Sequence, residues 1–110
     1  MMALTKNFKE TVLARVESDP AFARAMFDEA ISLFLNGESE TAKLILRDLV
    51  NATVGFETLA LQVEKPTKSV HRMLSVQGNP TMSNLAAIFG ALKSALRVEI
   101  KAHSVSVACG

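Results

Sequence analysis

The sequence has little that would cross-link the chain or hold it in a membrane. Its single cysteine, Cys109, rules out an intramolecular disulfide and suits a reducing compartment. The longest apolar stretches, such as residues 31–35, are too short to cross a bilayer. Lys6, Lys9 and Glu10 interrupt any apolar run at the start. We therefore expect no signal peptide, no membrane contact and a soluble, cytoplasmic protein.

Arrangements of residues that carry catalysis are also missing. The sequence has no glycine-rich phosphate loop, no metal-ligand cluster and no Ser/His/Asp set. Asp28 and Glu29 are adjacent, and adjacent residues of a helix point apart, so they cannot serve one acid–base site. His71 has Thr67 and Ser75 one helical turn away, and neither supplies a second metal ligand of the usual kind. We expect no enzymatic activity, no cofactor and no metal.

Charge is nearly balanced over the 110 residues, with a net charge of +1, but it is unevenly distributed. Residues 1–55 contain six Lys/Arg and eight Asp/Glu, a net charge of −2. Residues 56–110 contain six Lys/Arg and three Asp/Glu, a net charge of +3. A basic second half is suggestive of nucleic acid. About half of the residues are apolar, which is enough for one compact core, so we expect a single domain over residues 1–110.

Apolar residues recur at helical spacing between capping residues, Pro and Gly, which predicts an all-α fold. We expect helices at about residues 5–17, from Pro20 to Asn36-Gly37, from Ser39 to Gly55, over residues 56–63, around residues 67–74, and from a cap at Asn79 or Thr81 to Leu96. The expected core positions in residues 1–55 are Phe8, Val12, Leu13, Val16, Phe22, Met26, Ala30, Leu33, Phe34, Leu44, Ile45, Leu49 and Val50. Those in the second half are Phe56, Leu59, Ala60, Val63, Val70, Leu74, Leu85, Ile88, Phe89 and Leu92.

After Leu96 the spacing of apolar residues changes. Polar and apolar residues alternate from Arg97 to Lys101, which predicts a short strand that could pair with its own copy in a second subunit. We thus divide the domain into amino-terminal helices (1–55), a core with the strand (56–101) and a loosely held tail (102–110).

The stretch of residues 56–75 has the pattern of a helix-turn-helix. Two short helices that cross at a steep angle need an apolar and a small residue where they touch, and Leu59-Ala60 supplies both. The second helix needs an apolar face at four-residue spacing, which Val70 and Leu74 supply. No acid occurs from Lys65 to Ser75. The opposite face offers polar donors to the major groove, namely Thr67, Lys68, His71 and Arg72.

Short segments along most of the chain, including those just described, together carry a resemblance to a known family. They are Asp19-Pro20, Asn36-Gly37-Glu38, Leu46-Arg47-Asp48-Leu49-Val50 with Gly55, Leu59-Ala60, Val70, Leu74-Ser75, Gly78-Asn79-Pro80, and Leu92 to Lys101. In the segments that fall within them, residues 56–75 resemble the lambda-repressor-like (Cro-type, XRE) helix-turn-helix. The chain over about residues 7–101 resembles the addiction-module antidote proteins, which are antitoxins and transcriptional regulators of that superfamily.

The resemblance implies a bundle of five or six helices, usually a homodimer, that binds a palindromic operator in double-stranded DNA. Such proteins often repress their own operon and neutralise a small ribonuclease toxin. By position, the resemblance places Thr67, Lys68, His71 and Arg72 on bases, and Ser75 and Asn79 near phosphates. The acidic first half would suit a basic toxin. Two alternatives stay open: a helix-turn-helix repressor without a toxin, and a helical interaction module that has lost DNA binding.

The sequence departs from the family pattern in the turn. Glu64 stands where the family usually has Gly, Lys65 replaces an apolar residue and Pro66 replaces a capping Ser. A left-handed Glu64 would cost roughly 1 kcal/mol. Pro66 cannot supply a capping hydroxyl, and Thr67 is the alternative one residue later, so the recognition helix has two candidate starting points.

Overall fold

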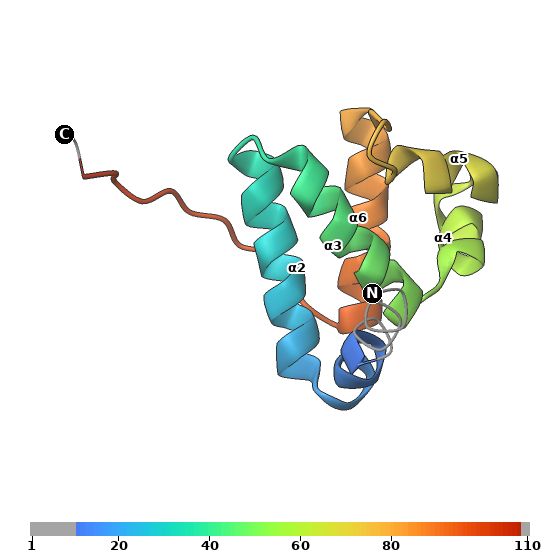
Figure 1. Cartoon of the computed structure of the whole chain (residues 1–110), viewed down its shortest axis with the longest axis horizontal. Coiled ribbons are helices and arrows are strands. Elements are labelled where there is room, and N and C mark those ends of the chain that lie inside the picture. Colours follow the sequence, from blue (N-terminus) through green and yellow to red (C-terminus); the bar gives the residue numbers. More distant parts are fainter. Residues whose placement is uncertain (1–10, 109–110) are drawn as a thin grey trace, which may run out of the picture.

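The structure is a computed structural model that describes residues 11–108, and within that range it contains helices and no strand. Residues 11–18 are helical. They are followed by α2 (Pro20–Leu35), α3 (Ser39–Ala52), α4 (Phe56–Val63), α5 (Thr67–Met73) and α6 (Met82–Leu96) (Figure 1). The predicted all-helical fold is confirmed for this part of the chain, whereas Cys109 and the predicted helical residues 5–10 lie outside it. None of the described helices is long and apolar enough to span a membrane.

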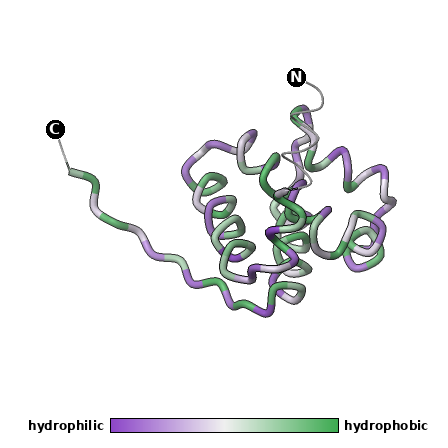
Figure 2. The backbone as a smooth tube through the Cα atoms, turned by 60° about the horizontal axis from the view of Figure 1, so that its bottom comes forward, coloured by the Kyte–Doolittle hydropathy of each residue, from purple (hydrophilic) through white to green (hydrophobic). Residues whose placement is uncertain are grey.

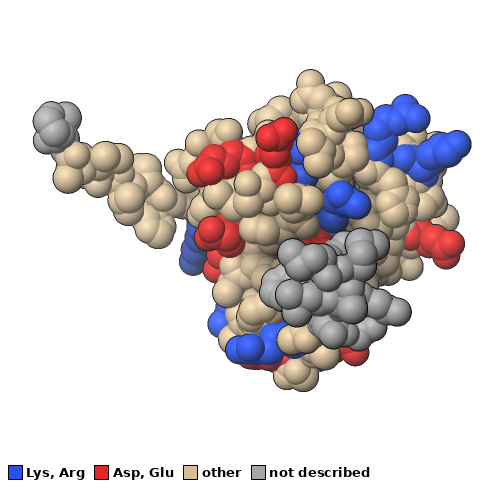
Figure 3. Space-filling view, in the orientation of Figure 1, with Lys and Arg blue, Asp and Glu red and all other residues tan. Residues whose placement is uncertain are grey.

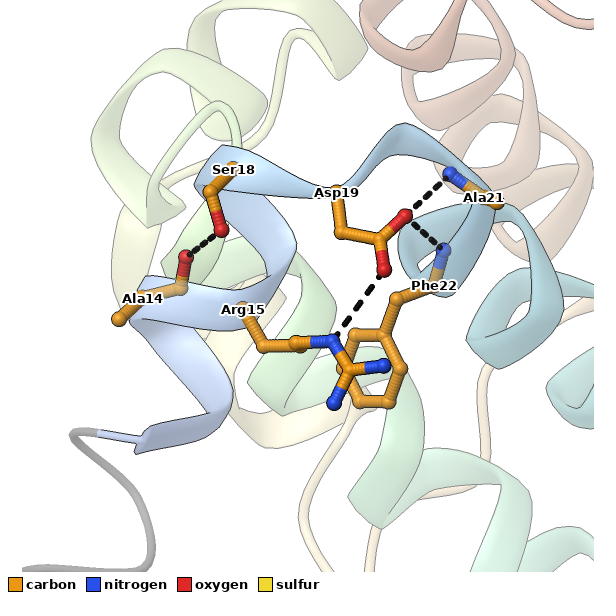
Figure 4. A network of polar contacts seen from close by, with 6 residues as sticks. All are labelled: Ala14, Arg15, Ser18, Asp19, Ala21 and Phe22. Carbon is orange, nitrogen blue, oxygen red and sulfur yellow. Dashed lines mark hydrogen bonds and ion pairs between the residues drawn. The ribbon is translucent and has the colours of Figure 1, made fainter.

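The start of α2 is fixed by a capping network (Figure 4). The Asp19 carboxylate accepts hydrogen bonds from the backbone N–H groups of Ala21, at 3.1 Å, and Phe22, at 3.2 Å. Its other oxygen pairs with Nε of Arg15 at 3.2 Å, and the Arg15 guanidinium lies 4.8 Å from the centre of the Phe22 ring. The bond from the Phe22 backbone, followed by the Arg15 contact, lowers the pKa of Asp19 below its ordinary 3.8. Asp19 thus caps α2, which begins at Pro20 as the sequence predicts.

The core is a single cluster to which every described helix contributes. Its fully buried members include Phe27 of α2, Leu46 and Leu49 of α3, and Leu92 of α6. The Phe89 ring of α6 lies 5.7 Å from the Phe27 ring and thereby joins α2 to α6. Figure 2 shows the apolar segments of the helices.

Three predicted core positions need correction. Leu13 is half-buried and lies outside the core cluster. Leu44 was expected on the apolar face of α3, but its side chain is 49% exposed and Leu46 takes the buried place. Leu33 is only half-buried, whereas Phe27 is fully buried. Long runs of apolar residues offer several overlapping faces at helical spacing, and packing against α6 selects the one that contains Phe27. At α6, the Thr81 hydroxyl accepts the Asn84 N–H at 3.1 Å, so Thr81 and not Asn79 is the cap.

The prediction of a strand at Arg97–Lys101 is wrong for the described chain. Arg97 adopts a left-handed conformation (φ 56°) that ends α6, and Val98 and Ile100 then pack against the core. From Lys101 to Ala108 every residue is exposed, and this tail extends away from the body beside α2 (Figure 1). No neighbouring strand in the described residues is available to satisfy its backbone groups, so no sheet forms.

Candidate nucleic-acid interface

The helices α4 and α5 form a packed pair at one edge of the molecule (Figure 1). Leu59 is fully buried and Ala60 is 4% exposed, which confirms them as the inner face of α4. Val70 and Leu74, one turn apart, are fully buried on the inner side of α5 and its end. The residues expected to hold the two helices together are therefore the ones that do so.

A three-residue turn joins the two helices. Glu64 is left-handed (φ 57°), as the resemblance implies for this position, and its N–H donates to the Leu61 carbonyl at 3.3 Å. Lys65 N–H donates to the Ala60 carbonyl at 3.1 Å, so the end of α4 is satisfied. Pro66 is the extended residue before α5 and Thr67 is its first helical residue, without a side-chain cap. The alternative in which Thr67 caps the helix is therefore wrong.

The outer side of α5 carries the four residues predicted to contact bases. Lys68 and Arg72 lie one helical turn apart and both are exposed, and Thr67 beside them is half-buried. Neither cation forms an ion pair with the described residues, where the Arg15–Asp19 pair is the one salt bridge found. In Figure 3, Lys and Arg side chains gather over α5, whereas acidic side chains gather over the ends of α2 and α3. The surface of α5 is thus basic and unneutralised.

His71 has a more constrained position than its exposure suggests. Its ring stacks on the ring of Phe56, the first residue of α4, with 3.9 Å between the centroids and 16° between the planes. One face of the imidazole is therefore covered, although His71 as a whole is exposed. The stacking fixes His71 beside the amino terminus of α4. No group of three or more His, Cys, Asp or Glu residues among residues 11–108 could hold a metal ion there.

The end of α5 is held by the loop that follows it. The Arg72 carbonyl accepts the Ser75 hydroxyl at 2.7 Å and the Ser75 N–H at 3.1 Å. Gly78 packs so closely on the same helix end that a Cβ would overlap the Arg72 carbonyl oxygen and lie 2.7 Å from that of Met73. Only glycine fits at this position, because the obstructing atoms belong to the backbone.

Lys43 of α3 holds this loop in turn, and sequence analysis missed it. Its side chain is 4% exposed, and its ammonium donates to the carbonyl oxygens of Val76, at 3.2 Å, and Gly78, at 2.6 Å. The signal was present, because Lys43 lies three residues before Leu46 and seven before Val50, at core spacing on the same helix. A lysine there must find acceptors or remain unsatisfied. The position of α5 thus depends on a residue outside the α4–α5 pair.

The structure brings the predicted base-contacting residues together on one short helix and places the two predicted phosphate contacts in the loop behind it. Ser75 uses its hydroxyl proton to close the end of α5, and its oxygen keeps acceptor capacity. Asn79 is exposed and makes no side-chain hydrogen bond to the described residues.

Comparison of the chain with protein-family models, curated proteins and solved structures finds no match.

Proposed function

We propose that this protein is a sequence-specific DNA-binding regulator in which α4, the turn and α5 act as a lambda-repressor-like helix-turn-helix. The observation that carries the proposal is the two-sided character of α5. Its inner side is completely buried through Val70, while Lys68 and Arg72 on its outer side are exposed and unpaired within the described chain. A short, rigidly held helix with free donors suits insertion into the major groove.

Within this proposal the side chains have distinct roles. Arg72 has a planar guanidinium that matches O6 and N7 of guanine, and Lys68 suits either a base or a phosphate. Thr67 and the exposed His71 would contact neighbouring bases. Ser75 and Asn79, at the carboxyl end, would contact phosphates and set the register.

The operator would be palindromic and the protein a homodimer. Two-fold symmetry places the two α5 helices about 34 Å apart, which is one turn of DNA. Repression would follow because the bound dimer covers the promoter. The resemblance to addiction-module antidote proteins extends the proposal to an antitoxin that represses its own operon. The acidic residues exposed on the first half, among them Glu38 and Glu40, suit a small basic ribonuclease as the partner.

Fluorescence anisotropy with a labelled duplex from the DNA upstream of the gene tests the proposal. We expect wild-type protein to bind this duplex more tightly than a scrambled one, with an affinity that falls steeply with salt. Arg72→Ala should weaken specific binding by about 1–3 kcal/mol and relax specificity at one base pair. If Lys68 contacts a phosphate, Lys68→Ala should weaken binding to all duplexes and reduce the salt slope by about 1.

Arg24→Ala is the matched control, because Arg24 is an exposed arginine on α2 and its removal changes the net charge equally. This variant should bind as the wild type does. Equal loss in the Arg24 and Arg72 variants would show that only net charge matters and would contradict the proposed role of α5. Salt-insensitive, weak binding by the wild type would favour the interaction module instead.

The antitoxin part has its own test. Purified protein should form a salt-sensitive complex with the small basic ribonuclease encoded beside it and inhibit its activity. Charge reversal at Glu38 and Glu40 should weaken that complex and leave DNA binding unchanged. A regulator that binds DNA but has no such partner is a plain repressor.

A further inference from the structure

An apolar groove of about 620 Å³ is lined by residues of α2 and α6, together with the loop that follows α5. Phe34 of α2 and Phe89 of α6 form part of its walls, and their rings meet edge to face at 5.8 Å. Leu35 and Met82 at its rim are 74% and 84% exposed. Large apolar side chains gathered around a groove mark an interaction surface.

The tail, residues 101–108, exposes apolar side chains that the described chain does not cover. Every residue of it is exposed, and it makes no hydrogen bond with the described part of the chain. Val105 and Val107 are 74% and 85% exposed, and their two-residue spacing puts both on one face of an extended chain. Figure 2 shows the alternating hydropathy along this segment. The tail therefore carries a small apolar face without a partner among residues 11–108.

The tail cannot easily fill the groove of its own subunit. Ile100, where the tail leaves the body, is itself part of the groove lining, and an extended chain carries Val105 about 16 Å beyond it. Folding back would require a tight turn. Residues 101–108 contain no Gly, Pro, Asn or Asp. Of the residues that favour such turns they have Ser104 and Ser106, and Ser106 lies between two β-branched valines that favour an extended chain.

We infer that the tail of each subunit lies in the α2–α6 groove of a second copy, so that two tails are exchanged in a closed dimer. The groove is then filled by apolar side chains that the same sequence provides. The groove lining includes Lys43 and Lys93 and the tail carries Lys101 and His103, so the contact rests on the apolar side chains and not on charge. In such an exchange each subunit contributes one tail and one groove. Both tails and both grooves are then occupied, so the assembly closes at two subunits.

The exchanged tail would also affect the proposed DNA-binding helix. Gly78 and Asn79, in the loop that holds the end of α5, are part of the groove lining. A seated tail would therefore contact the loop that positions α5 in the partner subunit. This consequence rests on the proposed function, whereas the exchange itself does not and can be measured without DNA.

Sedimentation equilibrium of the full chain without DNA tests the exchange, with circular dichroism to verify folding. The tail variant is Val105→Asp, Val107→Asp, and the groove variant is Leu35→Asp, Met82→Asp. All four side chains are largely exposed in the single subunit, so both variants should fold. We expect the wild type to be dimeric and each variant to dimerise at least about 100-fold more weakly. Leu61→Asp, at an 80% exposed leucine of α4, is the control and should dimerise as the wild type does.

Mixing the tail and groove variants gives the sharpest outcome. Each heterodimer would contain one intact tail seated in one intact groove, so the mixture should associate more strongly than either variant alone. A monomeric wild type would overturn the inference. So would a groove variant that dimerises normally while the tail variant does not, because the tails would then pair with each other. Dissociation by Leu61→Asp alone would place the dimer contact on α4 instead.

Discussion

Replacing Lys43 by methionine tests whether this buried lysine holds the loop behind α5. Methionine keeps most of the aliphatic stem and removes the ammonium, so the carbonyls of Val76 and Gly78 lose their donor. Two hydrogen bonds from a charged donor are worth about 3–6 kcal/mol together. Much of this is offset because the variant no longer buries an ammonium, which costs several kcal/mol. We expect a net loss of about 1–3 kcal/mol.

For a chain of this size, 1 kcal/mol corresponds to about 4 °C in Tm, so Lys43→Met should melt about 4–12 °C below the wild type. Thermal denaturation followed by circular dichroism measures this difference. Lys68→Met is the matched control, because Lys68 is exposed and makes no hydrogen bond with the described chain. It should leave Tm unchanged while weakening the proposed binding of DNA. An unchanged Tm for Lys43→Met would refute the claim that this lysine secures the loop.

Three further predictions concern local geometry, the first with a control substitution. Gly78→Ala should destabilise the fold by about 3 kcal/mol in urea denaturation, because its Cβ overlaps backbone oxygen at the end of α5; Gly90→Ala, where a Cβ meets open space, should be neutral or stabilising. Glu64→Gly should raise the free energy of unfolding by about 1 kcal/mol, since glycine adopts a left-handed conformation without strain; a loss of stability would contradict this. The pKa of Asp19 is lowered in the folded state, so its contribution to stability is present above the unfolded value of 3.8 and is lost as pH falls through the lower folded value. Asp19→Asn keeps a capping oxygen and should show a shallower loss of Tm between neutral and acidic pH, and a profile identical to the wild type would exclude this role.

The helix boundaries were largely predictable because local chemistry sets them. Asp19-Pro20 and Thr81 begin helices through side-chain and φ preferences that act over a few residues. The inner faces of α4 and α5 were predictable too, since Leu59 and Val70 have few alternatives in such short helices. In the longer helices, several apolar faces overlap, and only tertiary packing chose Phe27 over Leu33.

The candidate site was only partly predictable for a related reason. The polar outer face of α5 follows from helical spacing, so Lys68 and Arg72 could be assigned from the sequence. The contacts that position this face are between residues far apart in the chain. Lys43 bonds to carbonyls 33 and 35 residues away, and His71 stacks on Phe56 across the turn. No local pattern specifies such pairs. The strand at residues 97–101 failed similarly, because alternation predicts a strand only where a partner strand exists.

The contact between Lys43 and the loop at Val76–Gly78 also means that the basic half of the chain is not self-sufficient. Residues 56–108 cut off from the rest would lose the donor that secures this loop and the Phe27 ring that packs on Phe89. Folding of the two halves is therefore coupled, and α5 should keep its position only while α2 and α3 stay folded. A protease or a partner that unfolds the acidic half would therefore displace α5 and its basic face without contacting either.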